Sequence, residues 1–189
     1  YLAYSLIIIP AIVVALLAFL YGDQAMILLY HSAGSARIFG VLMLGFIGFS
    51  TTYIFGTLLT AQGSMKALNI MAVSALTVNV TMNLILIPRY GVLGAAISSA
   101  ATQLSTGLAQ LILSFRIVKI KFDRLYFIKL TLLALMLIIS AVFLKRFNTG
   151  WLKGSAVLCF AAFIATVVFD LVPFRKLRSL QSDIPLFKK

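Results

Sequence analysis

The sequence predicts an all-α protein, a polytopic bundle of membrane-spanning helices. Six stretches of about twenty apolar residues follow one another, and short connections between them hold almost every charge. A helix of about twenty apolar residues is long enough to cross the ~30 Å hydrocarbon core of a bilayer. Hydrophobic residues make up 62% of the chain and charged residues 11%, which excludes an ordinary soluble domain.

The predicted spans follow the apolar stretches in order. The first four contain no charged residue, whereas the fifth has Lys129 near its start and the sixth has Lys153 and Asp170 near its two ends. Charged side chains near a span end can reach the interface, so all six stretches qualify. The predicted spans are Leu2–Leu20, Ile38–Thr60, Leu68–Ile87, Val92–Phe115, Tyr126–Leu144 and Leu152–Val172.

The predicted domain organisation is one transmembrane region, residues 1–175, followed by a cytoplasmic tail, residues 176–189. The chain begins at Tyr1, without an initiator methionine or a signal-peptide pattern. We therefore expect it to be a fragment, with its first helix an internal span of a longer protein.

Basic residues are divided unequally between the two sides of the predicted bundle. Eleven lie on one side and five on the other, and short loops rich in lysine and arginine stay in the cytoplasm. This predicts a multi-pass plasma-membrane protein with both chain ends cytoplasmic and the turn Pro88–Gly91 outside. The net charge of +12 follows from this topology and not from nucleic-acid binding. The cytoplasmic set is Lys66, Arg116, Lys119, Lys121, Arg124, Lys129, Arg175, Lys176, Arg178, Lys188 and Lys189.

The segment Arg116–Lys129 alternates basic and apolar side chains. This pattern is typical of a backbone that lies among anionic lipid headgroups. A solvated basic loop is the alternative, but it would leave the apolar side chains in water.

Small residues recur at helical spacing in the second and fourth spans. Lipid gives helices no hydrophobic drive to associate, so close contact through small residues is one means of packing them. We therefore expect these faces to contact other helices. The rows are Gly48, Thr52, Gly56 and Thr60 in the second span; Gly94, Ser98, Thr102 and Thr106 in the fourth; and Ala95, Ser99, Gln103 and Gly107 beside them.

Two amides, Asn79 and Asn83, lie four residues apart and share one face of the third span. They either line a substrate path, together with Gln103, or bond across to the second or fourth helix, with Gln103 or Ser99 as partners. The second interpretation is favoured, since an unpaired amide in hydrocarbon is costly. These three amides are the predicted substrate-path candidates.

Prolines and glycines predict the hinges and turns. Pro10 removes a backbone hydrogen bond within the first span and should kink it. Pro88 should end the third helix, Gly91 should permit the turn, and Gly94 should let the fourth helix approach a neighbour closely.

No predicted span has a central charged residue or histidine, and motifs for phosphate binding, metal binding or nucleophilic catalysis are absent. We therefore predict neither an enzyme nor a catalytic residue, metal site or cofactor. The single cysteine, Cys159, lies in mid-span and is interpreted as a small buried hydrophobic residue.

The run Asn79–Ala101, NVTMNLILIPRYGVLGAAISSAA, resembles a hairpin of the polysaccharide and lipid-linked oligosaccharide flippases, within the multidrug/oligosaccharidyl-lipid/polysaccharide exporter superfamily. Pro10 followed by Leu20–Gly22, and Leu59–Gly63 before Lys66, resemble other parts of that family. The resemblance covers roughly Ile7–Lys119. The matching hairpin residues are Asn79, Asn83, Ile87, Pro88, Arg89, Tyr90, Gly91, Gly94, Ala95 and Ala96.

The resemblance implies the C-terminal six helices of a two-lobed transporter with twelve to fourteen spans. It further implies movement of a polyprenyl-diphosphate-linked glycan across the cytoplasmic membrane by alternating access, with an N-terminal lobe outside this chain completing the path. Three alternatives stay open: an ion-coupled multidrug efflux antiporter of the same superfamily, a polytopic membrane enzyme of polysaccharide synthesis, and a structural membrane subunit.

Overall fold

The computed structural model describes residues 1–119, 123–147 and 150–172, and these ranges fold into six α-helices without a strand. The predicted all-α class is confirmed. The predicted tail, residues 176–189, lies outside the described residues. The helices are α1 (Leu2–Tyr30), α2 (Ala36–Ala61), α3 (Met65–Tyr90), α4 (Val92–Ile117), α5 (Arg124–Arg146) and α6 (Trp151–Val168).

Five of these helices are long and apolar enough to cross a membrane, which indicates a membrane protein. The exception is α4, although its 26 residues exceed the required length. Serine, threonine and glutamine occupy many of its positions, and they lower its mean hydropathy. All six stretches were predicted as spans. Helix α4 differs from the other five because it keeps polar side chains for contacts with other helices.

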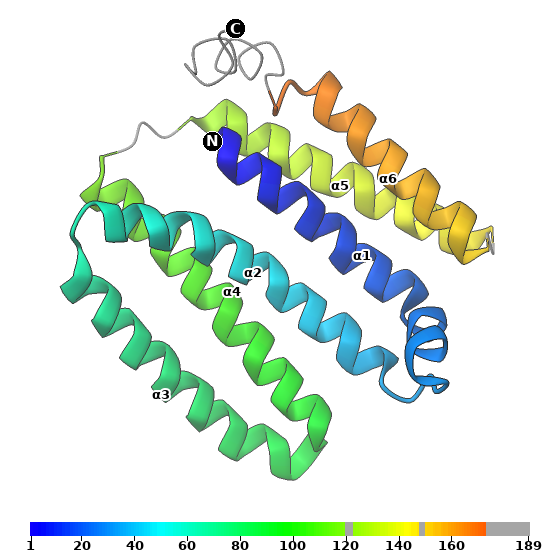
Figure 1. Cartoon of the computed structure of the whole chain (residues 1–189), viewed down its shortest axis with the longest axis horizontal. Helices are drawn as coiled ribbons and strands as arrows, with labels where there is room; N and C mark the ends of the chain where they lie inside the picture. The colour runs from blue at the N-terminus through cyan, green and yellow to red at the C-terminus, as the bar shows by residue number, and fades with distance from the viewer. Residues whose placement is uncertain (120–122, 148–149, 173–189) are drawn as a thin grey trace, which may run out of the picture.

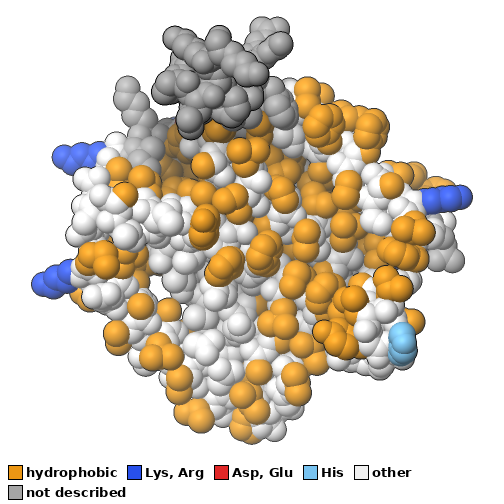
Figure 2. Space-filling view, viewed as in Figure 1, with side chains coloured by type: hydrophobic (Ala, Val, Ile, Leu, Met, Phe, Trp, Pro, Cys, Tyr) orange, Lys and Arg blue, Asp and Glu red, His pale blue; other side chains and the backbone are white. Residues whose placement is uncertain are grey.

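The helices lie side by side in the order α3, α4, α2, α1, with α5 and α6 on the far side of α1 (Figure 1). The backbones of α5 and α6 approach α1 and each other, but among the described elements they do not approach α2, α3 or α4. Helix α1 therefore joins two groups. Hydrophobic side chains cover much of the face in Figure 2, and the visible lysines and arginines lie at its margins.

The first helix is longer than its predicted span and changes direction at Tyr21. This residue alone in α1 leaves helical dihedral angles (φ −123°, ψ 20°), and the helix then continues to Tyr30. Its last part turns away from the axis of the first part (Figure 1). The connection between the first two predicted spans, residues 21–37, is thereby reduced to residues 31–35. Pro10 keeps helical dihedrals, because the φ that proline imposes fits a helix and only one hydrogen bond is lost.

The α3–α4 hairpin turns on a single residue. Helix α3 continues two residues beyond Pro88, and Gly91 then adopts φ 57° and ψ −134°, a region open essentially to glycine alone. Its N–H donates to the Ile87 carbonyl over 2.8 Å. A Cβ placed on Gly94 would lie 2.3 Å from the Leu86 carbonyl oxygen, so α4 starts in backbone contact with α3. The geometry at Gly91 and Gly94 is compatible with their predicted roles, whereas α3 ends two residues later than the predicted end at Pro88.

We predict that Gly91→Ala destabilises the protein by about 1–3 kcal/mol, the usual cost of forcing a side chain into a glycine-only region. The matched control is Gly150→Ala, because Gly150 has a negative φ of −53° and open space around its Cβ position. Unfolding in detergent, followed by far-ultraviolet circular dichroism, measures both variants. Equal stability of the two would contradict the role assigned to Gly91.

Candidate functional site

The most extensive contact between two helices is the α2–α4 seam, formed by Gly45, Gly48 and Gly56 on α2 and by Ala100, Gln103, Gly107 and Gln110 on α4. A Cβ on Gly48 would lie 2.4 Å from the Gln103 carbonyl carbon. A Cβ on Gly107 would lie 2.6 Å from the Gly48 carbonyl oxygen. Real Cβ atoms do not approach so closely, so only glycine lets the two backbones meet here.

Most glycines of the small-residue rows predicted from the sequence, and Ser98 and Thr102 with them, lie in contacts between helices. On α2, Gly48 and Gly56 face α4, whereas Thr60 is exposed and lies outside the contact. On α4, the row that contains Ser98 faces α3 and the row that contains Gly107 faces α2. Helix α4 is therefore packed on two sides through small residues, which explains why it tolerates so many polar side chains.

Asn79 is the centre of an amide network with Asn83, Ser98 and Thr102. Its side-chain nitrogen donates to the Thr102 hydroxyl over 3.2 Å, and its side-chain oxygen accepts from the Asn83 amide over 2.9 Å. Its backbone carbonyl accepts from the Ser98 hydroxyl over 3.1 Å. Two of these hydrogen bonds thus join α3 to α4, and the third lies within α3. This arrangement favours the structural interpretation of these amides.

The predicted partners of the amides, Gln103 and Ser99, are wrong by one position. The observed partners, Thr102 and Ser98, each precede a predicted one, and one residue turns a helix face by about 100°. Gln103 lies in the α2–α4 seam, where its backbone contacts Gly48. The structure therefore does not bring the three substrate-path candidates together on one surface.

Three buried side-chain oxygens in this group of helices have no hydrogen-bond partner among the residues that the structure describes: Thr52 Oγ1, Asn83 Oδ1 and Gln110 Oε1. The Gln110 side chain is 7% exposed, and its oxygen lies 2.9 Å from where a Cβ on Gly56 would be. Buried acceptors without partners are costly and uncommon in native proteins. They give the α2–α3–α4 group an unused capacity to accept hydrogen bonds.

Hydroxyl groups join α1 to both neighbouring groups of helices. Tyr4 and Thr51 place their hydroxyl oxygens 3.2 Å apart between α1 and α2, and Ser5 and Tyr126 place theirs 2.8 Å apart between α1 and α5. The Asp123 carboxylate caps α5 by accepting from two backbone N–H groups. These contacts were not predicted, although a tyrosine and a serine within an apolar span are a signal that could have suggested them.

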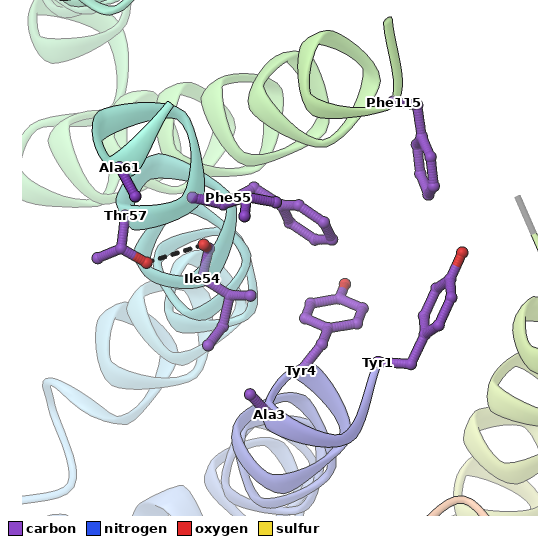
Figure 3. Close-up of a pocket in the computed structure, with 9 residues that line it drawn as sticks. Tyr1, Ala3, Tyr4, Ile54, Phe55, Thr57, Ala61 and Phe115 are labelled. Atoms are coloured by element: carbon purple, nitrogen blue, oxygen red, sulfur yellow. Dashed lines mark hydrogen bonds between the residues drawn. The ribbon is translucent and has the colours of Figure 1, made fainter. Parts of the chain in front are cut away.

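Two of the hollows beside α1 lie along its first part. The first, about 480 Å³, lies against Tyr4, Phe55 and Phe115, whose rings come from three helices (Figure 3). The ring centroids of Tyr4 and Phe55 are 5.1 Å apart. The second, about 410 Å³, is an apolar groove between α1 and α6. Cys159 lines this groove and is exposed, so its predicted burial is wrong, because α1 and α6 leave an open groove at this position.

The basic segment Arg116–Lys129 is divided by the fold. Arg116 lies in the last turn of α4, Lys119 has a positive φ of 52°, and Arg124 starts α5. Residues 120–122 lie outside the described residues. Contact of this segment with anionic lipid headgroups stays a prediction.

Within the described ranges, no three histidine, cysteine or acidic side chains lie close enough together to hold a metal ion. No protein-family model, curated protein or solved structure matches this chain. The flippase resemblance therefore depends on the residues of the hairpin and the neighbouring spans alone.

We predict that Gly48→Ala lowers stability by about 1–3 kcal/mol, the usual cost of overpacking a well-packed contact. The extra methyl group would meet the Gln103 backbone, which cannot move without shifting α4. Gly40→Ala is the control, since its nearest neighbours would be 3.7 Å from the new Cβ. Comparable unfolding midpoints in detergent for the two variants would show that the α2–α4 seam is loose.

A double-mutant cycle tests the amide network. We expect Asn79→Ala to cost about 1 kcal/mol, and to be coupled to Thr102→Val by about 0.6 kcal/mol, the average for hydrogen bonds between membrane helices. Thr77→Val is the control, because the exposed Thr77 hydroxyl bonds only to the Val73 carbonyl of its own helix. Equilibrium unfolding in mixed micelles measures all variants, and additive effects of Asn79→Ala and Thr102→Val would refute the bond.

Proposed function

We propose that this chain is the C-terminal helical part of a transporter that moves polyprenyl-diphosphate-linked glycans across the cytoplasmic membrane by alternating access. The observation that carries the proposal is the α3–α4 hairpin. Its sequence resembles that of the flippase family over Asn79–Ala101, and several of the resembling residues have a distinct physical role at the junction. In an unrelated pair of helices, we would not expect a resembling sequence in which several residues each make a separate contact at the turn.

The roles of these residues differ from one another. Asn79 and Asn83 hold the hydrogen bonds to α4 and within α3, Gly91 supplies the positive φ of the turn, and Gly94 allows backbone contact with Leu86. Together they make the hairpin a rigid pair of helices. A rigid hairpin suits a lobe that moves as one body during alternating access.

The division of the fold around α1 supports the same proposal. Helices α2, α3 and α4 are joined by backbone contact, whereas the described backbones of α5 and α6 approach α1 and not these three, and Phe127 of α5 reaches α4 through its ring contact with Phe115. In the proposed transporter, α1 is the element against which the two groups rock. The break at Tyr21 and the docking of its hydroxyl against Gly154 of α6 supply a joint at the outer end of α1.

The proposed orientation follows from charge. The C-terminal end of α2 and the start of α5 lie at the same end of the molecule as the start of α1 (Figure 1). Lys66, Arg116 and Arg124 lie in or beside these segments, so we place this end in the cytoplasm. The diphosphate of the glycan carrier then enters from the basic side, where cations raise the local concentration of anions.

Carboxylates favour the flippase over an ion-coupled efflux antiporter. Asp23 is the one acidic residue within the described helices, and it lies beyond the break at Tyr21. Proton or sodium coupling in transporters generally uses carboxylates inside the spans. Coupling by this part of the chain would therefore lack its usual group.

The proposal predicts that the complete transporter containing this chain accelerates the movement of a fluorescent polyprenyl-diphosphate glycan across liposome membranes. A membrane-impermeant reagent that modifies only the outer leaflet measures the rate, with and without an ion gradient. A fluorescent phospholipid is the control cargo and should not be accelerated. Export of small cationic drugs under an ion gradient, without glycan movement, would replace this proposal with the efflux alternative.

A further inference from the structure

A pocket of about 280 Å³ lies at the proposed outer end of the protein, between α1, α2 and the start of α4. Its size is close to the lower limit of ~300 Å³ for small-molecule sites, so it suits a compact chemical group. Glycine and alanine at Gly22, Ala36 and Gly40 leave the space open, and Phe19 and Leu93 give it apolar walls.

Two opposite charges line this pocket, Asp23 from α1 and Arg37 from α2. Neither side chain takes part in a hydrogen bond or an ion pair with any residue that the structure describes. The carboxylate and the guanidinium are therefore both available to a ligand. We call this site the Asp23–Arg37 pocket.

The surroundings of the Asp23–Arg37 pocket indicate a membrane surface. After the break at Tyr21, the end of α1 presents Leu28, Leu29 and Tyr30 with 63%, 65% and 73% of their surface exposed. Three large apolar or aromatic side chains in succession are poorly placed in water. They suit the boundary between headgroups and acyl chains, where tyrosine is enriched. Asp23 lies on the same helical segment, one to two turns earlier.

We propose that the Asp23–Arg37 pocket binds the headgroup of phosphatidylethanolamine. The Asp23 carboxylate accepts hydrogen bonds from the lipid ammonium, and the Arg37 guanidinium donates to the phosphate. The headgroup carries both charges a few bonds apart, so it satisfies the two side chains at once. The apolar walls at Phe19 and Leu93 take the glycerol and the upper acyl chain. A free phosphate would use Arg37 alone and would leave Asp23 repelling it.

Native mass spectrometry of the full chain in detergent, titrated with phosphatidylethanolamine, tests this proposal. Asp23→Asn and Arg37→Gln should each weaken binding at least tenfold, because each removes one of two charge-assisted contacts. Asp170→Asn and Arg89→Gln are matched controls, since they remove one charge of each sign from positions that do not line the pocket. The controls should bind within twofold of the unchanged chain.

A comparison of lipids distinguishes a pocket that binds both charges of the headgroup from a site that binds only an anion. Phosphatidylcholine should bind at least fivefold more weakly, because its trimethylated amine has no N–H to donate. Excess inorganic phosphate should not displace bound phosphatidylethanolamine. Binding that is unchanged in Asp23→Asn, or equal for the two lipids, would overturn the proposal, as would displacement by phosphate. Thermal unfolding of each variant establishes that a weakened signal comes from the pocket and not from misfolding.

Discussion

Backbone contact between α2 and α4 is the constraint on which the rest of this structure depends. Lipid tails are as apolar as leucine, so membrane helices cannot be joined by the hydrophobic effect and must gain from dispersion and hydrogen bonds at close range. Gly48 and Gly107 allow the two backbones to approach this closely, since a Cβ at either position would lie under 3 Å from the opposite backbone. The polar side chains of α4 can then be buried against protein, and α3 can be attached to its other side.

The attachment of α3 shows how polar groups replace hydrophobic burial. No residue of α3 is fully buried, yet the helix is held by the amide network around Asn79 and by the contact of Gly94 with Leu86. Most of its surface faces outward and is apolar, which suits lipid. On the other side of the molecule, leucines such as Leu133, Leu137 and Leu158 are completely buried between α1, α5 and α6. The two groups of helices thus use different means of packing, and α1 contacts both.

The two ends of the protein differ in their chemistry, and this difference connects fold to function. Aromatic rings gather where α1 starts and α5 begins, beside the hollow of Figure 3. The opposite end holds the Asp23–Arg37 pocket and the exposed apolar end of α1. In the proposed transporter the first end meets the anionic carrier in the cytoplasm, and the second end is anchored in the outer leaflet.

Length, hydropathy and small-residue spacing were sufficient to predict the helical class, six helices, the glycine turn and the packed faces of α2 and α4. These features are local, because a span needs its apolar length and a tight turn needs glycine whatever surrounds it. Hydrogen-bond partners could not be predicted in this way. Asn79 bonds to Ser98 and Thr102 and not to Ser99 and Gln103, since the rotation of α4 about its axis is set by the close contacts at Gly48 and Gly94. The same holds for Asp23 and Arg37, which lie fourteen positions apart in what the sequence presents as a loop. They share a pocket because α1 continues as a helix beyond the break at Tyr21. At this break the Tyr21 hydroxyl lies against Gly154 of α6, a contact that sequence periodicity does not record.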